Sequence, residues 1–169
     1  MYTLSETSLK MLKGVHPNLV NFMTELIKIS PWNFKITAGV RTAEEQNRIY
    51  QKGRSASGSK VTKVDGYKLK SNHQVKFNGL GYAADIGVLV KEKVNVSIME
   101  NGKKVEKVIE KDVYKGTWKD FHYYQDIYNA AKNAGLLEKY GIEWGGNCWR
   151  TFKDAPHWQI KGADRVAYK

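Results

Sequence analysis

The sequence contains one cysteine, three prolines and no long apolar run. A single cysteine excludes an internal disulfide, so the fold must be stabilised by its core, as is typical of proteins made in a reducing compartment. No apolar stretch approaches the roughly 20 residues that a membrane span needs, so we expect no transmembrane segment. The first residues lack the basic start and apolar stretch of a signal peptide, which predicts synthesis in a cytoplasm without a leader.

Arginine is also scarce, because only five of the 28 basic residues are Arg and the rest are Lys. Recognition of bases and phosphates favours the planar guanidinium, so this composition argues against a nucleic-acid partner. The formal net charge of +11 still favours an anionic partner, with a merely solvated lysine-rich surface as the alternative. Residues 52–76 hold seven basic residues and one acidic residue, and we expect this excess to border the functional site.

The length of 169 residues, with 41% hydrophobic and 12% aromatic residues, is typical of one folded domain with its own core. Helical and strand-like patterns occur in the same chain, with no internal repeat or linker. We therefore predict an α+β fold, a small single domain over residues 1–169 with a central antiparallel sheet flanked by helices.

Helical spacing and capping signals predict four helices, and alternating polarity predicts a short strand. The helices are expected over residues 3–14, 17–30, 43–52 and 117–134, and the strand over residues 34–37. Thr3 with Glu6, and Thr42 with Glu45, have the spacing of capping boxes at helix starts.

Two Asn-Gly pairs predict hairpin turns. Asn101-Gly102 predicts an inserted surface hairpin over residues 91–115. Asn78-Gly79 predicts a second hairpin that pairs position 73 with position 84, or with position 85 if one residue is bulged. Either register brings His73 close to Asp85.

Two of the four histidines, His73 and His157, each accompany a carboxylate in a loop beside an expected strand. His73 with Asp85 is by itself more often a structural pair than a metal site. Two imidazoles and one carboxylate would nevertheless form a three-ligand zinc site with an open position, as catalytic zinc has. Asp154, three residues before His157, would then be the general base.

Other chemistries are less well supported. His16 and His122 are accounted for by packing or surface roles, and Cys148 in its Trp/Gly loop is better explained as a packed thiol than as a nucleophile. The chain has no His-Glu-x-x-His helix and no Gly-rich phosphate loop.

Three motifs follow one another along the chain, and two of them contain the candidate zinc ligands and the candidate base. The motifs are Ile36-Thr37-Ala38-Gly39-Val40-Arg41-Thr42-Ala43-Glu44-Glu45-Gln46 with Tyr50 and Gly53, then Ser71-x-His73 with Gly81-x-Ala83-x-Asp85, then Trp144-Gly145-Gly146 with Trp149, Phe152 and Asp154-x-x-His157. Together they resemble the VanY-like LD- and DD-peptidases. Within that family the chain is most similar to bacteriophage endolysins of the L-alanyl-D-glutamate peptidase type.

The resemblance implies a zinc-dependent endopeptidase that cleaves the L-alanyl-D-glutamate bond of peptidoglycan stem peptides with a zinc-activated water. It implies that Zn²⁺ is bound at the sheet edge, that a general base and a substrate-binding arginine act beside it, and that a serine hydroxyl lines the site. The implied ligands are His73, Asp85 and His157, the base is Asp154, the arginine is Arg41 and the serine is Ser71.

The resemblance also implies a monomeric, antimicrobial lysin that reaches the cell wall after release through the inner membrane, without a separate wall-binding domain. Anionic wall or outer-membrane polymers are a further expected partner. A D-alanyl-D-alanine carboxypeptidase or dipeptidase with the same zinc site, or a non-catalytic wall-binding domain, are the alternatives. One departure from the family pattern is an insertion of residues 76–80 between Val75 and Gly81.

Overall fold

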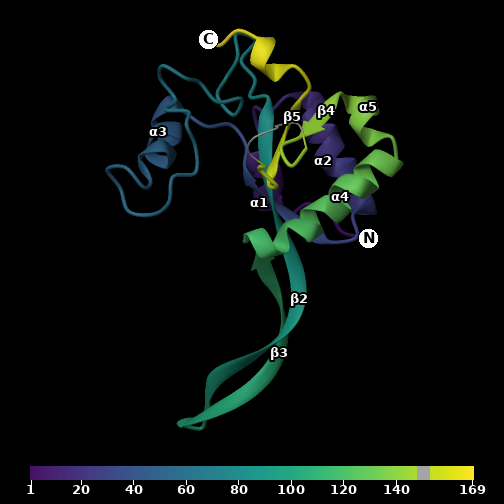
Figure 1. Ribbon diagram of the computed structural model, residues 1–169. Helices are drawn as coiled ribbons and strands as arrows, with labels where there is room; N and C mark the ends of the chain where they lie inside the picture. Colours follow the sequence, from purple (N-terminus) through teal and green to yellow (C-terminus); the bar gives the residue numbers. More distant parts are fainter. Residues whose placement is uncertain (148–152) are drawn as a thin grey trace.

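The computed structural model describes residues 1–147 and 153–169. It has the predicted α+β fold, in which helices pack against a central antiparallel sheet (Figure 1). In chain order the elements are α1 (Glu6–Met11), α2 (Pro17–Ile29), β1 (Asn33–Ala38), α3 (Ala43–Gln51), β2 (Ala83–Glu100), β3 (Lys103–Lys115), the 3₁₀ turn η1 (Trp118–Asp120), α4 (Phe121–Asn133), α5 (Leu136–Tyr140), β4 (Ile142–Trp144), β5 (His157–Ile160) and the 3₁₀ turn η2 (Ala163–Arg165).

Strand β2 is the centre of the sheet, whose order is β1-β2-β5-β4, with β3 also paired to β2. At the start of β2, β1 occupies one edge and β5 occupies the other, so that Asp85 is opposite Ala38 on one side and His157 on the other. The pairing with β1 is irregular between Ile36 and Ala38, where the register shifts. Asp85 is therefore held between two strands.

The core lies between the sheet and helices α2, α4 and α5, which gather on one side of it (Figure 1). Apolar residues at helical spacing on α2 are fully buried, among them Leu19, Phe22 and Leu26. The ring of Phe22 lies 5.3 Å from that of Trp158, the residue after His157. Packing of Trp158 thus fixes the strand that carries His157. No helix in the described ranges is both long and apolar enough to cross a membrane.

Helix α3 and the residues that follow it, up to position 71, form a separate lobe, here called the α3 lobe (Figure 1). The helix begins at the predicted capping box, in which Thr42 and Glu45 bond reciprocally. The Nδ2 of Asn47 donates to the carbonyl of Asp65 at 3.0 Å, so the loop is folded back on the helix.

Two local predictions were wrong. Helix α1 begins at Glu6 with Ser5 as its cap, because the Ser5 hydroxyl accepts from the amide of Ser8, so Thr3 does not cap it. The predicted pairing of His73 with position 84 or 85 is also absent.

A turn does form at residues 78–79, but it is longer than the predicted two residues: the amide of Gly79 donates to the carbonyl of Lys76, and the amide of Lys76 donates to the carbonyl of Leu80. The strand pairing fails because β1 and β5 already occupy both edges of β2 at Asp85. A strand has only two edges, so His73 approaches Asp85 from a loop, through its side chain.

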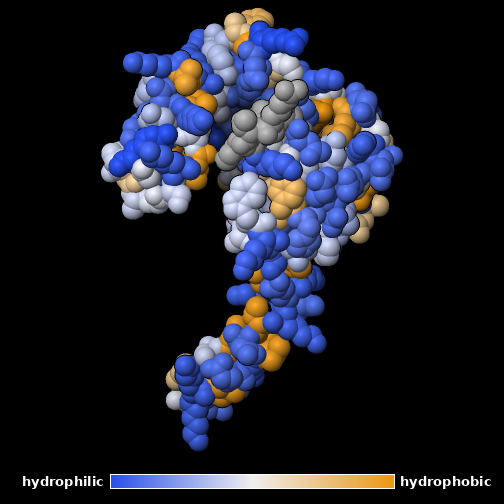
Figure 2. Space-filling model, in the orientation of Figure 1, coloured by the Kyte–Doolittle hydropathy of each residue, from blue (hydrophilic) through white to orange (hydrophobic). Residues whose placement is uncertain are grey.

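Beyond Leu89, β2 leaves the body and pairs with β3 alone as a long two-stranded arm (Figures 1 and 2). The turn is at Asn101-Gly102 as expected, with both residues at positive φ. Ile98 is opposite Val105 in the register, so apolar side chains share one face of the arm. Whether residues 91–115 are an insertion stays a prediction.

The two halves of β2 should differ in their effect on stability. We expect Ile86→Ala, in the buried half, to lower the free energy of unfolding by about 2–5 kcal/mol. Ile98→Ala, on the same strand but in the arm, should cost about 1 kcal/mol or less. Urea unfolding followed by tryptophan fluorescence measures both, and equal losses would show that arm and body share one core.

Candidate metal centre

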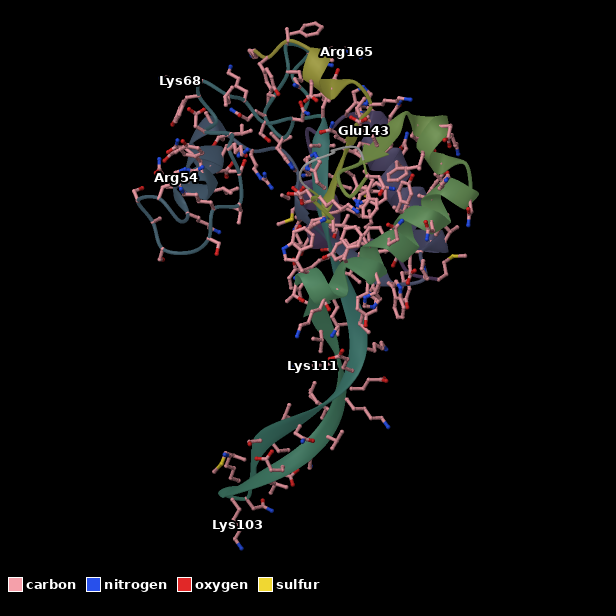
Figure 3. All side chains as sticks on the ribbon, viewed as in Figure 1. Arg54, Lys68, Lys103, Lys111, Glu143 and Arg165 are labelled. Atoms are coloured by element: carbon pink, nitrogen blue, oxygen red, sulfur yellow. The ribbon has the colours of Figure 1, made fainter. Side chains whose placement is uncertain are left out.

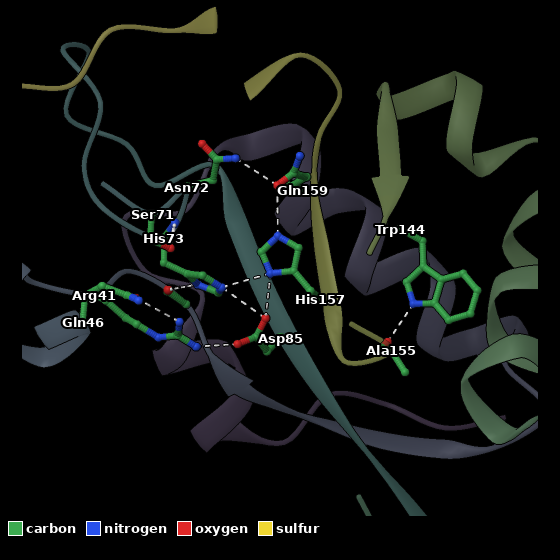
Figure 4. A network of polar contacts seen from close by, with 11 residues as sticks. Arg41, Gln46, Ser71, Asn72, His73, Asp85, Trp144, Ala155, His157 and Gln159 are labelled. Atoms are coloured by element: carbon green, nitrogen blue, oxygen red, sulfur yellow. Dashed lines mark hydrogen bonds and ion pairs between the residues drawn. The ribbon is translucent and has the colours of Figure 1, made fainter. Parts of the chain in front are cut away.

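Three side chains converge where β2 and β5 meet (Figure 4). Asp85 lies on β2, His157 begins β5, and His73 reaches them from the loop before β2. The Oδ1 of Asp85 lies 3.1 Å from Nε2 of His73 and 3.0 Å from Nδ1 of His157. The two nitrogens are 3.3 Å apart, so one atom of each side chain faces a common point.

The contact that Nδ1 of His73 makes with the backbone determines which ring nitrogen carries the proton. Nδ1 lies 2.7 Å from the carbonyl oxygen of Gly39, and because a carbonyl can only accept, Nδ1 carries the hydrogen. Nε2 therefore presents its lone pair to Asp85. Only glycine fits at position 39, since a Cβ there would lie 1.9 Å from the carbonyl oxygen of Met11.

His157 is fixed in the opposite tautomer by side chains. Its Nε2 lies 3.0 Å from Oε1 of Gln159, whose Nε2 donates to Oε1 of Glu143 at 2.6 Å. The Glu143 carboxylate can only accept, so the amide oxygen of Gln159 must face His157. His157 consequently donates from Nε2 and turns the Nδ1 lone pair toward Asp85.

Three acceptor atoms that face one another repel unless a cation lies among them. The ligand atoms of His73, Asp85 and His157 lie within 4.8 Å of one another. Four ligands arranged tetrahedrally at about 2.1 Å from Zn²⁺ are about 3.4 Å apart, close to the separations given above. The donor set and its tautomers therefore fit a metal ion such as Zn²⁺ with one position left open.

The electrostatics of the site favour an ionised ligand. Burial resists the charge of Asp85, but His73 and His157, when their rings carry a proton toward it, outweigh burial and hold the pKa of the carboxyl well below its usual range. Burial lowers the pKa of His73. Burial would also lower the pKa of His157, but the protonated ring bonds to Asp85 and is stabilised by the charge of that carboxylate, so the pKa is raised instead.

Arg41 lies in the turn between β1 and α3 and pairs with the other oxygen of Asp85, through Nη2. Its Nη1 donates to Oε1 of Gln46 at 3.4 Å, and its backbone amide donates to the carbonyl of His73 at 3.0 Å. Arg41 thus joins the α3 lobe to the candidate metal ligands.

Asp154 lies in the loop before β5, where its carbonyl accepts from the amide of His157 at 3.2 Å. Burial, followed by the charge of Asp85, raises the pKa of the Asp154 carboxyl. The opposing influence of His157 and Arg41 is smaller. A carboxylate of increased basicity therefore lies within electrostatic reach of the ligands.

Ser71 shapes the turn that presents His73. Its hydroxyl accepts from the amide of His73 at 3.3 Å, and its own amide donates to Oε1 of Gln74 at 2.8 Å. The expectations for Cys148, and the motif residues Trp149 and Phe152, lie outside the described residues.

Sequence reasoning did not single out the residues that orient the two histidines. Gln159 follows His157 by two positions on one strand, and alternation places both side chains on the same face, so this signal was present in the sequence. The carbonyl of Gly39 and the carboxylate of Glu143 had no comparable signal, because their contacts depend on tertiary structure.

The concentration of positive charge is only partly at the surface. Lys76 is 0% exposed, so it adds nothing to the positive charge at the surface. The remaining six basic residues are exposed on the α3 lobe, where Arg54 and Lys68 are labelled in Figure 3. Figure 2 shows a hollow between this lobe and the body. The six residues are Lys52, Arg54, Lys60, Lys63, Lys68 and Lys70.

The chain is similar to a known protein family, to a curated protein and to a solved structure. Residues 1–116 match the family described as phage L-alanyl-D-glutamate peptidase. The peptidoglycan L-alanyl-D-glutamate endopeptidase CwlK of Bacillus subtilis (strain 168) is 28% identical over 125 residues, which are 74% of this chain and 59% of that protein. The crystal structure of the L-Ala D-Glu endopeptidase ChiX of Serratia marcescens superposes with a TM-score of 0.60 at 25% identity, covering 97% of this chain and 93% of ChiX.

The family match covers only some of the candidate site residues. His73 and Asp85 lie within the matched residues of the family, whereas Asp154 and His157 lie beyond them. The superposition on ChiX extends over nearly the whole chain. The chain spans 59% of the length of CwlK.

Metal binding can be tested on one histidine with a matched control. We expect Zn²⁺ at 100 times its dissociation constant to stabilise the protein by about 2.7 kcal/mol, seen as a higher thermal midpoint. His157→Ala should lose this effect, while His122→Ala on the exposed side of α4 should keep it. Calorimetric titration with Zn²⁺ checks the stoichiometry. Equal affinity of His157→Ala and the unaltered protein would rule out this centre.

Proposed function

Because the chain belongs to the phage L-alanyl-D-glutamate peptidase family, we propose that it hydrolyses the L-alanyl-D-glutamate bond of peptidoglycan stem peptides with Zn²⁺ held by His73, Asp85 and His157. The observation that carries this proposal is the set of three acceptor atoms that face one point from three separate segments. Both histidines are held in the tautomer that a metal ligand requires.

A bound Zn²⁺ would supply a Lewis acid that acidifies water and polarises the scissile carbonyl. The chain itself supplies the proton transfer. Asp154 has a raised pKa, and no residue in the ranges 1–147 and 153–169 forms a hydrogen bond with its carboxylate, so it is suited to take a proton from the attacking water and return it to the leaving amine. Its place three residues before His157 keeps it near the ligands without making it one of them.

Arg41 is proposed to bind the substrate carbonyl. A guanidinium has five N–H donors, so donors remain after the contacts of Arg41 with Asp85 and Gln46. Its positive charge would stabilise the developing oxyanion. Ser71 is proposed to line the same site.

The exposed basic residues of the α3 lobe support an anionic wall or outer-membrane polymer as an additional partner. We propose that residues 1–169 act as a monomeric single peptidase domain that reaches the wall after release through the inner membrane, with residues 91–115 as a peripheral elaboration.

The role of Asp154 predicts a separation of activity from metal binding. Asp154→Asn should lower kcat by about 10²–10⁴-fold, because the amide cannot accept the proton, while Zn²⁺ affinity changes little. Asp112→Asn, an exposed change on the arm, is the matched control and should leave both unchanged. Steady-state hydrolysis of a purified muropeptide gives kcat. Parallel loss of metal and activity would instead make Asp154 a ligand or a structural residue.

The bond cleaved is tested by mass spectrometry of digested peptidoglycan. The proposal predicts new alanine carboxyl ends and new glutamate amino ends, and their loss on chelation. Release of only a terminal D-alanine would establish the carboxypeptidase alternative. Intact peptides with a zinc-loaded protein bound to insoluble wall would establish the non-catalytic one.

A further inference from the structure

Lys76 is buried completely, although burial removes its ammonium from water. Its Nζ donates to Oδ1 of Asn72 at 2.8 Å and lies 3.4 Å from the centre of the Tyr168 ring. Burial lowers the pKa of Lys76 to about 8, against the opposing charge of Asp164. At neutral pH the side chain is therefore an ammonium, which can donate hydrogen bonds but cannot accept them.

The partners of Asn72 leave its amide only one orientation. Oδ1 accepts from Lys76 and from the hydroxyl of Tyr168, the latter at 3.1 Å. Nδ2 donates to Oδ1 of Asp164 at 2.7 Å and to Oε1 of Gln159 at 2.9 Å. A flipped amide would place its NH₂ against an ammonium and its oxygen against a carboxylate.

Asn72 thereby extends the chain of hydrogen bonds that ends at the metal centre (Figure 4). The Oε1 of Gln159 accepts from Asn72 and also from Nε2 of His157, at 3.0 Å. Glu143 holds the other end of the Gln159 amide. The orientation of the Gln159 amide is therefore set from two sides, by Asn72 and by Glu143.

We propose that Lys76 and Asn72 are positioning residues for the metal centre, which keep the proton of His157 on Nε2 and its Nδ1 lone pair toward the metal. The proposal rests on the proposed function in that the metal is Zn²⁺ bound for peptide hydrolysis. Lys76 touches neither metal ligand nor substrate and acts only through Asn72 and Gln159.

The proposal also assigns a role to residues 76–80, the departure from the family pattern. The amide of Phe77 donates to the carbonyl of Ala167 at 3.0 Å, and Lys76 forms an isolated bridge with Tyr168. The inserted residues thus hold the end of the chain against Lys76. The ring of Tyr168 then covers the ammonium and excludes water from it.

Two variants test the proposal with competition for Zn²⁺ by a chromophoric chelator. Asn72→Asp keeps the side-chain shape and adds an ion pair with Lys76, but it places an acceptor oxygen against Gln159. We expect Zn²⁺ affinity to fall about 10–100-fold in Asn72→Asp and about 10-fold in Lys76→Met. Thermal unfolding of the metal-free proteins shows whether each variant is folded.

Lys70→Met is the matched control. Lys70 is exposed and also approaches Tyr168, at 5.6 Å from the ring centre, but it donates to the carbonyl of Lys169 and not to Asn72. Its Zn²⁺ affinity should equal that of the unaltered protein. If Asn72→Asp and Lys76→Met also bind Zn²⁺ with unaltered affinity while the unaltered protein cleaves stem peptides, the positioning role is overturned and the proposed function stands.

A readout that does not depend on metal separates the two proposals. Ring ¹⁵N shifts of His157 in the metal-free protein, on the alkaline side of its titration, report which nitrogen carries the proton. We expect Nε2–H in the unaltered protein and a gain of Nδ1–H in Asn72→Asp. An unchanged tautomer would refute the positioning role even if the unaltered protein proves not to bind Zn²⁺, a result that would refute the proposed function.

Discussion

The negative charge of Asp85, buried between two imidazoles and a guanidinium, constrains the rest of the structure. One carboxylate oxygen faces His73 and His157, and the other faces Arg41. A buried carboxylate without such partners would protonate or unfold the site around it. The loop of His73, the strand of His157 and the turn of Arg41 therefore have to be folded together before Asp85 can stay ionised.

The sheet supplies this arrangement because β2 is paired on both edges at Asp85. Pairing with β5 aligns Asp85 with His157, and the register shift opposite Ala38 leaves the chain free to turn toward α3 at Arg41. Farther along, β2 pairs with β3 only, in the arm that extends away from the body (Figure 1), and none of the three candidate ligands lies there. One strand thus has a half that is paired on both edges and carries a candidate ligand, and an exposed half that carries none.

Much of this architecture follows from local patterns in the sequence. Helix α2 shows its apolar spacing, α3 its capping box, and the arm its Asn-Gly turn, because each of these depends on neighbours in the chain. The error at Asn78-Gly79 arose because a turn signal does not reveal which strand edges are already occupied. Ser5 caps α1 instead of Thr3 because two hydroxyls compete at one helix start, and the spacing of residues does not decide between them.

The residue types of the candidate site and their order along the chain could be predicted from the sequence. The orientation of the side chains could not. Motif spacing could indicate His73, Asp85 and His157, whereas the carbonyl of Gly39 and the burial of Lys76 depend on contacts between distant segments. The role of Asn72 depends on such contacts as well, since its four partners lie 4, 87, 92 and 96 positions away.

The ring orientations of His73 and His157 therefore respond differently to substitutions elsewhere in the chain. His73 is oriented by a backbone carbonyl, which every residue at position 39 would retain, although only glycine fits there. His157 is oriented, among the contacts in the described ranges, by the side chain of Gln159, which in turn contacts Asn72 and, through it, Lys76. Substitutions that change the affinity of the candidate centre for a metal without removing a ligand should therefore be found among the residues that orient His157. There a change of one hydrogen-bonding group is transmitted through amides whose orientation has only two alternatives.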